Sequence, residues 1–325
     1  MKALARSWQT GKQVLSGLSS YVPLLRRRFN QGTRGSDSAR YCYSVWLRHR
    51  LMAEESGWTC PQPVVAELGP GDSIGIGLAA MLSGAKEYYA LDIVDYATLR
   101  RNIAIFEELI ELFRKRADIP DEKEFPLVKP TLADYSFPAL SLSRMELGRC
   151  LAKDRLDKIR HSIIDPKWPG SLIHIIVPWH DPRVIPPGSV DLIFSQAVLE
   201  HVTDLELAYR AMNHWLAPGG FISHQIDFKC HWKASEWNGH WTYSDRTWRW
   251  IQGRQKYLLN REPHSTHIRL LQQEGFRVVR DQTQRRESNI RPQQLASRFR
   301  DMPPDDLTIS GAFIQAAKRG PIPAR

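Results

Sequence analysis

The stretch that most constrains the fold of this chain is 64–75, which reads VVAELGPGDSIG. Five residues of an apolar strand run into a turn that contains two glycines, and an apolar helix follows. Glycine suits such a turn because a Cβ would block the approach of backbone N–H groups to a bound ligand. The stretch therefore predicts a strand, a ligand-binding loop and a helix, in that order.

Strands and helices alternate through the rest of the chain. A helix over 74–83 and a long amphipathic helix over 96–116 follow the first strand. A further helix begins at the capping box Thr203-x-x-Glu206 and stops at Pro218-Gly219-Gly220. The remaining predicted strands are 88–91, 172–177, 190–194, 221–228, 276–279 and 309–317. This alternation predicts a doubly wound α/β fold.

Two irregular segments and an N-terminal piece lie outside this alternation. Residues 117–170 are read as an insertion, and 229–262 as a second one that is rich in tryptophan. Residues 1–40 are expected to form a loosely held extension, and 41–55 have helical spacing. The predicted organisation is a basic N-terminal extension with its helix over 1–60 and one α/β domain over 61–325.

Charge is concentrated at the N-terminus. The chain has 325 residues and a formal charge of +10, and residues 1–50 hold ten Lys or Arg against a single acid, Asp37. The body is therefore close to neutral, which does not favour nucleic acid as a partner. The basic, partly apolar run 24–29 is compatible with contact to a membrane surface and with a solubilising tail.

Composition indicates a globular chain of a reducing compartment. Hydrophobic residues make up 42% and charged residues 25%, which excludes a disordered chain. The four cysteines show no CxxC spacing, which argues against a disulfide framework and a Cys-rich zinc site. The N-terminus lacks the apolar core of a secretory signal, so we expect a cytoplasmic protein, with a mitochondrial presequence as the alternative.

The glycine turn departs from a dinucleotide-binding fingerprint. Ile74 stands where the third glycine of G-x-G-x-x-G belongs. Glu67, two residues before the first glycine, would repel a pyrophosphate but attract an ammonium group. Asp92, at the tip of the second strand, is placed to accept hydrogen bonds from ribose hydroxyls. Each feature alone also fits a plain turn or a solvated carboxylate.

Four segments together resemble the successive motifs of class I S-adenosylmethionine-dependent methyltransferases. They are ELGPGDSIG, YYALD, SVDLIFSQAVLEHV at 189–202 and LAPGGFISHQIDF at 216–228. They are most similar to the small-molecule branch called methyltransferase type 11. The resemblance runs from about residue 64 to 228. It implies a Rossmann-like, doubly wound, seven-stranded sheet with the last strand antiparallel, and S-adenosyl-L-methionine as cofactor.

The resemblance also implies the cofactor residues, with the adenine near Trp179, His180 and Asp181. Pro70 departs from the pattern by stiffening the loop. By motif position, the cofactor would be held by Glu67, Gly69, Gly71, Asp72, Asp92, Ile93, Asp181 and Ser195.

The acceptor would lie at the ends of the fourth and fifth strands. Candidate catalytic residues there are Asp227, His201 and His224, of which Asp227 is preferred because it lies nearer the strand's carboxyl end. His201 fits a plain helix-start contact equally well. No metal is expected, because His224 and Asp227, three apart on a strand, point to opposite faces.

The tryptophan-rich segment has two interpretations. Its aromatic residues fit a lid over the substrate, and they fit a small satellite core under a long loop equally well. Under the first interpretation, the substrate residues are Trp232, Trp237, Trp241 and Tyr243.

The sequence thus predicts a methyltransferase that acts on a small-molecule acceptor at oxygen, such as a saccharide, a lipid-linked compound or a specialised metabolite. RNA methylation guided by the basic N-terminus and a non-catalytic S-adenosylmethionine-binding protein remain alternatives. The segment 194–197 lacks the motif of DNA base-nitrogen methylation, so nucleic acid is not the expected substrate. An NAD-linked oxidoreductase is disfavoured by Ile74 and Glu67.

Overall fold

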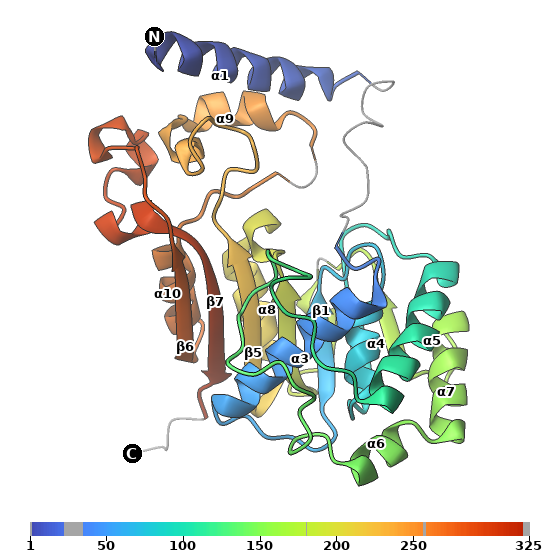
Figure 1. The fold of residues 1–325 in the computed structure, drawn as a ribbon. Helices are drawn as coiled ribbons and strands as arrows, with labels where there is room; N and C mark the ends of the chain where they lie inside the picture. The colour runs from blue at the N-terminus through green and yellow to red at the C-terminus, as the bar shows by residue number, and fades with distance from the viewer. Residues whose placement is uncertain (1, 23–34, 180, 256–257, 321–325) are drawn as a thin grey trace.

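A seven-stranded mixed sheet forms the centre of the computed structural model, which describes residues 2–22, 35–179, 181–255 and 258–320 (Figure 1). Its strand order is β3-β2-β1-β4-β5-β7-β6. β7 is antiparallel to both neighbours, and β1 to β5 are parallel. The strands are β1 Val64–Leu68, β2 Glu87–Leu91, β3 Ile173–Ile176, β4 Val190–Gln196, β5 Leu216–Asp227, β6 Phe276–Arg285 and β7 Ile309–Lys318. The predicted sheet, including its antiparallel last strand, is confirmed.

Helices cover both faces of the sheet (Figure 1). One face carries α3 Ala39–Glu55, α4 Gly75–Leu82, α5 Leu99–Lys115 and α7 Lys153–Ile164, and the other carries α8 Leu205–Trp215 and α10 His264–Gln273. Alternation along β1 divides its side chains between two apolar cores. Val65 packs into the core under α3 and α4, whereas Ala66 and Leu68 pack into the core under α8.

The helix α3 is built into the same core as the sheet. Ser38 caps it by accepting a hydrogen bond from the Tyr41 amide at 3.4 Å. Just before the cap, the Ser36 hydroxyl donates to the Pro70 carbonyl at 2.6 Å and accepts from the Ser73 amide at 2.9 Å. The start of α3 therefore helps to hold the glycine loop.

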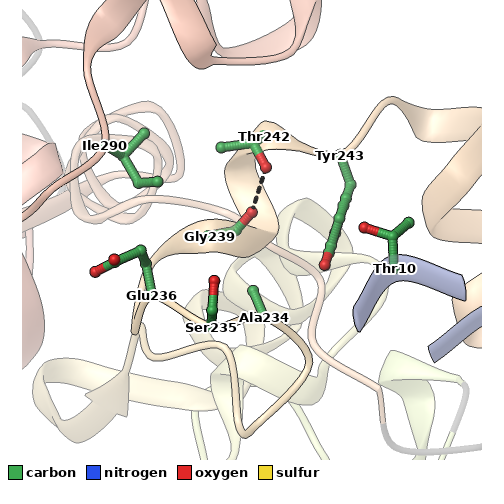
Figure 2. A pocket seen from close by; sticks show the side chains of 8 residues that line it. All are labelled: Thr10, Ala234, Ser235, Glu236, Gly239, Thr242, Tyr243 and Ile290. Carbon is green, nitrogen blue, oxygen red and sulfur yellow. Dashed lines mark hydrogen bonds between the residues drawn. The ribbon is translucent and has the colours of Figure 1, made fainter. Parts of the chain in front are cut away.

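The N-terminal residues correct the sequence prediction, because α1 Lys2–Ser19 is a helix that lies across α9 Asp245–Gln252 (Figure 1). Gly17 permits this crossing, since a Cβ there would overlap the Trp250 carbonyl. A small cavity of about 60 Å³ lies between Thr10 of α1 and the segment 234–243 (Figure 2). The basic run 24–29 lies outside the described residues.

Several element ends also differ from the prediction. Asp204, not Thr203, caps α8, because its Oδ1 accepts from the Leu207 amide at 2.9 Å. The expected stop 218–220 lies inside β5, which begins directly after α8. The insertion contributes α6 Arg144–Cys150 and α7. No helix among the described residues has the length and apolarity needed to cross a membrane.

Candidate cofactor and acceptor site

A cavity of about 770 Å³ lies at the carboxyl ends of the parallel strands β1, β2, β4 and β5. In open α/β sheets, this edge is where ligands bind. β1, β2 and the segment after β3 contribute Gly69, Pro70, Gly71, Asp92, Ile93 and Trp179 to its wall. β4, β5 and the segments after them contribute Gln196, Val198, Glu200, His201, Asp227 and His231. The cavity therefore brings the predicted cofactor loop and the predicted acceptor side together.

The glycine loop forms one wall of this cavity. Gly69 and Gly71 have φ values of +65° and +73°, in the left-handed region that favours glycine. A Cβ on Gly69 would lie 2.7 Å from the side chain of Val198, so this position has no room for one. Asp72 is buried beside the loop, and its carbonyl accepts a hydrogen bond from Arg101 at 2.9 Å.

Asp92 stands where β2 reaches the cavity. Its Oδ1 accepts from the Ile93 amide at 2.6 Å and from the Val94 amide at 3.2 Å, and its Oδ2 lies 3.4 Å from the Gly71 amide. Burial raises the pKa of Asp92, and these three amides oppose the rise. The carboxyl group is therefore fixed by the backbone at the cavity wall, and Ile93 lines the cavity next to it.

Glu67 is not brought to the cavity. It is 1% exposed, and its Oε2 accepts a hydrogen bond of 2.5 Å from the Tyr88 hydroxyl. Burial raises its pKa to about 8, although the Tyr88 hydroxyl and the Gly77 amide oppose this rise. Strand alternation explains the position, because residue 67 points to the same face as Val65, toward α4. The expected contact with an ammonium group in the cavity is therefore not present in this geometry.

Of the three residues predicted to lie near the adenine, the structure describes two, and one of these lines the cavity. Trp179 lines the cavity, and its amide donates to the Asp92 carbonyl at 3.1 Å. Asp181 is outside the lining and pairs with Arg183, whose hydrogen bonds lower the pKa of Asp181 to about 2. His180 lies outside the described residues. Ser195 is fully buried in β4 and does not line the cavity.

Asp227 is the carboxylate at the end of β5. Its Oδ2 lies 3.1 Å from Lys229 Nζ and 3.3 Å from His231 Nε2. Burial alone would raise the pKa of Asp227, but the hydrogen bond from His231 and the charge of Lys229 outweigh burial and lower it. His201 and His231 stand beside it, with ring centroids 5.5 Å apart. This group places an ionised carboxylate at the end of β5, on the side of the cavity predicted for the acceptor.

His224 lies away from the cavity. It is 1% exposed, and its Nδ1 is 2.8 Å from the Ser195 hydroxyl. Burial, together with the neighbouring His49 and His267, lowers its pKa to about 3. A histidine that is neutral and enclosed by the protein cannot meet a substrate proton, so this geometry does not support His224 as the base.

The four predicted substrate residues also lie outside the cavity lining. Trp237 and Trp241 are buried, and their indole N–H groups donate to the carbonyls of Glu287 and Arg261 at 2.8 and 2.9 Å. The Tyr243 hydroxyl donates to the Lys233 carbonyl at 3.1 Å. Trp232 is 91% exposed. Trp237 and Trp241 join the apolar core under α8, whereas Tyr243 packs against a small separate cluster around Trp248, as the satellite-core interpretation expects.

Two polar cavity residues within the quoted motif 189–202 are not among the predicted site residues. Gln196 ends β4, and Glu200 follows in the short 3-10 helix Leu199–His201. Glu200 is 3% exposed, and burial raises its pKa well above the usual range, although backbone hydrogen bonds at residues 200 and 227 oppose this rise. The sequence pattern that indicates them is the change from an apolar strand to polar residues at and just after its end.

The cavity has a one-sided charge. The carboxylates Asp92, Asp204 and Asp227 line it, and the described lining contains no lysine or arginine. Glu200 adds a fourth carboxyl group, but its raised pKa favours the neutral form. Such a wall attracts cations and hydrogen-bond donors and repels phosphates. Within the described part of the chain, no group of three His, Cys, Asp or Glu side chains is arranged to hold a metal ion.

Residues 179–223 match the family model described as Methyltransferase domain. This segment includes Trp179, β4 and the acceptor-side residues up to His201, and it sits in a sheet of order 3-2-1-4-5-7-6. This seven-stranded sheet with its antiparallel last strand is the fold that the resemblance to class I S-adenosylmethionine-dependent methyltransferases implies. Fold and family model together support an enzyme that uses S-adenosyl-L-methionine as its cofactor.

Solved structures give distant likenesses. An S-adenosylmethionine-dependent methyltransferase from Mesorhizobium loti is 13% identical, with a TM-score of 0.40, and the match covers 82% of this chain and 96% of that one. One from Methanosarcina mazei is 13% identical, with a TM-score of 0.43 and coverages of 82% and 98%. Phosphoethanolamine N-methyltransferase 2 of Haemonchus contortus, in complex with S-adenosyl-L-methionine, is 13% identical, with a TM-score of 0.39 and coverages of 88% and 58%. No curated protein sequence matches the chain.

Proposed function

We propose that this methyltransferase transfers a methyl group from S-adenosyl-L-methionine to a hydroxyl oxygen of a small-molecule acceptor. The observation that carries the proposal is the shared cavity, which has the glycine loop and Asp92 on one side and Asp227 on the other. Pockets of roughly 300–1,000 Å³ hold drug-sized ligands, so about 770 Å³ accommodates a nucleoside-sized cofactor beside a small acceptor.

The cofactor side is assigned to residues that fit a cationic nucleoside. Gly69 and Gly71 leave the loop backbone without side chains, and Asp92 offers carboxylate oxygens to ribose hydroxyls. Trp179 offers an aromatic face at the position expected for adenine. The acidic lining favours a positively charged sulfonium and disfavours a pyrophosphate. When bound, S-adenosyl-L-methionine supplies the electrophilic methyl group.

We assign to Asp227 the role of the base that accepts the proton of the acceptor's hydroxyl group. Its lowered pKa keeps it ionised at neutral pH, so it can accept a hydrogen bond from the hydroxyl and then the proton as the O–C bond forms. His231 and Lys229 hold the carboxylate in place. His201 lines the same side and is the second candidate for this proton. Positioning the hydroxyl for in-line attack supplies the rest of the catalysis.

Isotope labelling tests the proposal. The full chain is incubated with methyl-labelled S-adenosyl-L-methionine and the small-molecule fraction of a cell extract, and the products are examined by mass spectrometry. We expect a labelled methyl ether. Label found only in RNA would support the RNA-methylating alternative, and cofactor binding without any labelled product would support the non-catalytic one.

We also propose that α1 contacts an anionic membrane surface. Its outer face exposes Trp8, Leu15 and Leu18, at 66%, 67% and 39% exposure, and the ammonium group of Lys12 lies 3.5 Å from the Trp8 ring centroid. The chain has no acidic residue before Asp37. Exposed tryptophan and leucine beside basic groups are typical of helices that lie in a membrane interface. RNA contacts would not require this apolar stripe.

A further inference from the structure

Gln196 lines the cavity and is linked to the interior of the protein by a series of hydrogen bonds. It is the last residue of β4, and its side-chain amide lies 3.0 Å from Nε2 of His49 in α3. Nδ1 of His49 lies 2.7 Å from the Ser223 hydroxyl of β5, which lies 2.9 Å from the Gln315 amide of β7. His49, Ser223 and Gln315 are each 0% exposed. A buried polar chain therefore runs from β7 to the cavity.

The orientation of the Gln315 side-chain amide determines which atoms donate and which accept along this series of hydrogen bonds. One end of its amide lies 2.8 Å from the Met52 carbonyl oxygen, and the other end lies 3.1 Å from the Ala53 amide nitrogen. Only with nitrogen toward Met52 and oxygen toward Ala53 does each end meet a suitable partner; the reverse would set oxygen against oxygen and nitrogen against nitrogen. The Gln315 oxygen therefore also faces the Ser223 hydroxyl, which donates its one proton to it.

The orientation of Gln315 determines the protonation of His49. Because Ser223 gives its proton to Gln315, it can only accept from His49, so Nδ1 of His49 carries the hydrogen. Burial lowers the pKa of His49 to about 4, which keeps the ring neutral and leaves Nε2 as an acceptor. Nε2 must then meet the amide nitrogen of Gln196.

Gln196 thereby turns its carbonyl oxygen away from His49. The far end of its amide lies 3.4 Å from the Lys129 carbonyl, which is the longest contact in this series of hydrogen bonds. That contact would favour nitrogen at this end, but it is too long to outweigh the 3.0 Å contact with His49. The lining of the cavity includes Gln196. In this orientation the oxygen meets only the Lys129 carbonyl among its described contacts, and a carbonyl cannot donate to it. The oxygen therefore keeps its capacity to accept a hydrogen bond at the end of β4.

We propose that the Gln196 carbonyl oxygen, locked in orientation by His49, Ser223 and Gln315, binds the reacting group of the methyl acceptor and selects a hydrogen-bond donor there. This inference rests on the proposed function and narrows its substrate class. A hydroxyl or an ammonium group satisfies the oxygen, whereas a carboxylate or phosphate oxygen would be repelled by it. The acidic lining acts in the same direction.

The first test needs no activity. The purified full chain is labelled with ¹⁵N-histidine, and the His49 signals are assigned by their loss in His49→Gln. We expect a neutral ring at pH 7 with hydrogen on Nδ1 and none on Nε2. Hydrogen on Nε2, in a neutral or a charged ring, would overturn the inferred direction of the chain.

The second test uses two variants with the labelled cofactor and the small-molecule extract described above. Gln196→Met removes both polar ends at similar volume, and we expect slower labelling by about 3- to 10-fold at limiting extract, the loss of one hydrogen bond. Ser223→Ala breaks the chain behind Gln196 and should give a smaller loss that disappears at saturating extract, as expected for weakened binding. Gln62→Met, on the exposed loop before β1, is the control.

The outcomes separate the two proposals. If the wild-type protein fails to bind S-adenosyl-L-methionine in calorimetry, the proposed function is wrong. The tautomer of His49 then still tests the inferred direction of the hydrogen bonds. If the wild type is active and Gln196→Met labels as fast as Gln62→Met, the role of Gln196 is wrong. A product methylated on a carboxylate, as a methyl ester, would also overturn it.

Discussion

Replacing Glu67 with Gln should change how stability depends on pH. The folded state raises the pKa of Glu67 from 4.5 to about 8, so between these values the folded chain retains a proton that the unfolded chain has released. The unfolded state then binds fewer protons, and stability falls as pH rises through this window. From pH 5 to pH 8 the loss is about 3.5 kcal/mol, because the slope of 1.36 kcal/mol per pH unit decreases as pH approaches each pKa. Gln has no proton to lose and keeps an acceptor for the Tyr88 hydroxyl.

Urea unfolding of both proteins at pH 5 and pH 8 measures this effect. We expect the free energy of unfolding of Glu67→Gln, relative to the wild type, to rise by several kcal/mol between the two pH values. Glu111→Gln, on the exposed side of α5, is a matched control that should follow the wild type at both pH values. Parallel behaviour of wild type and Glu67→Gln, or a variant that is less stable at pH 8, would refute the burial of this carboxyl group.

Three further predictions concern the site and the N-terminus. Asp227→Asn should lower kcat about 100-fold or more, with calorimetric cofactor affinity unchanged, because the proton acceptor is lost; an unchanged kcat contradicts it. Gly69→Ala should reduce the free energy of unfolding in urea by about 1–3 kcal/mol, since φ is +65° and the Cβ meets Val198; wild-type stability contradicts it. Trp8→Ser with Leu15→Ser should reduce sedimentation with vesicles that contain anionic lipid; equal sedimentation of variant and wild type contradicts membrane contact through α1.

The fold and the cavity wall formed by the glycine loop and Asp92 could be predicted from the sequence because their signals are local. Short apolar strands separated by helices define a parallel sheet, and two glycines after a strand indicate a tight loop. The position of Asp92 follows from chain order alone, since it comes directly after the second strand. These features depend on neighbours within a few residues.

The orientation of single side chains could not be predicted in the same way. β1 is buried on both faces, so its hydrophobic pattern does not show that Glu67 points toward α4. His224 follows the same rule within β5, where the sequence shows a histidine near a strand end but not the face to which it points. Strand alternation places successive residues on opposite faces of the sheet, but it does not show which side chain reaches the cavity.

Other parts of the site depend on contacts between distant segments. Gln196 meets His49 across 147 residues of sequence, and no local pattern predicts that pair. The tryptophans of 232–250 fit a substrate lid and a satellite core equally well, and the indole partner of Trp237, the Glu287 carbonyl, comes from another segment of the chain. α1 looked like a loose extension because the surface that it packs on, α9, lies more than 200 residues away.

Calorimetric titration with S-adenosyl-L-methionine tests the central claim most directly, through Asp92→Ala and its matched control Asp181→Ala. Asp92 lines the cavity, whereas Asp181 pairs with Arg183 outside its lining. We predict that the wild type and Asp181→Ala bind the cofactor alike, and that Asp92→Ala binds about 10- to 100-fold more weakly, through the loss of charge-assisted hydrogen bonds. Absence of binding in the wild type, or equal binding by all three proteins, would contradict the account.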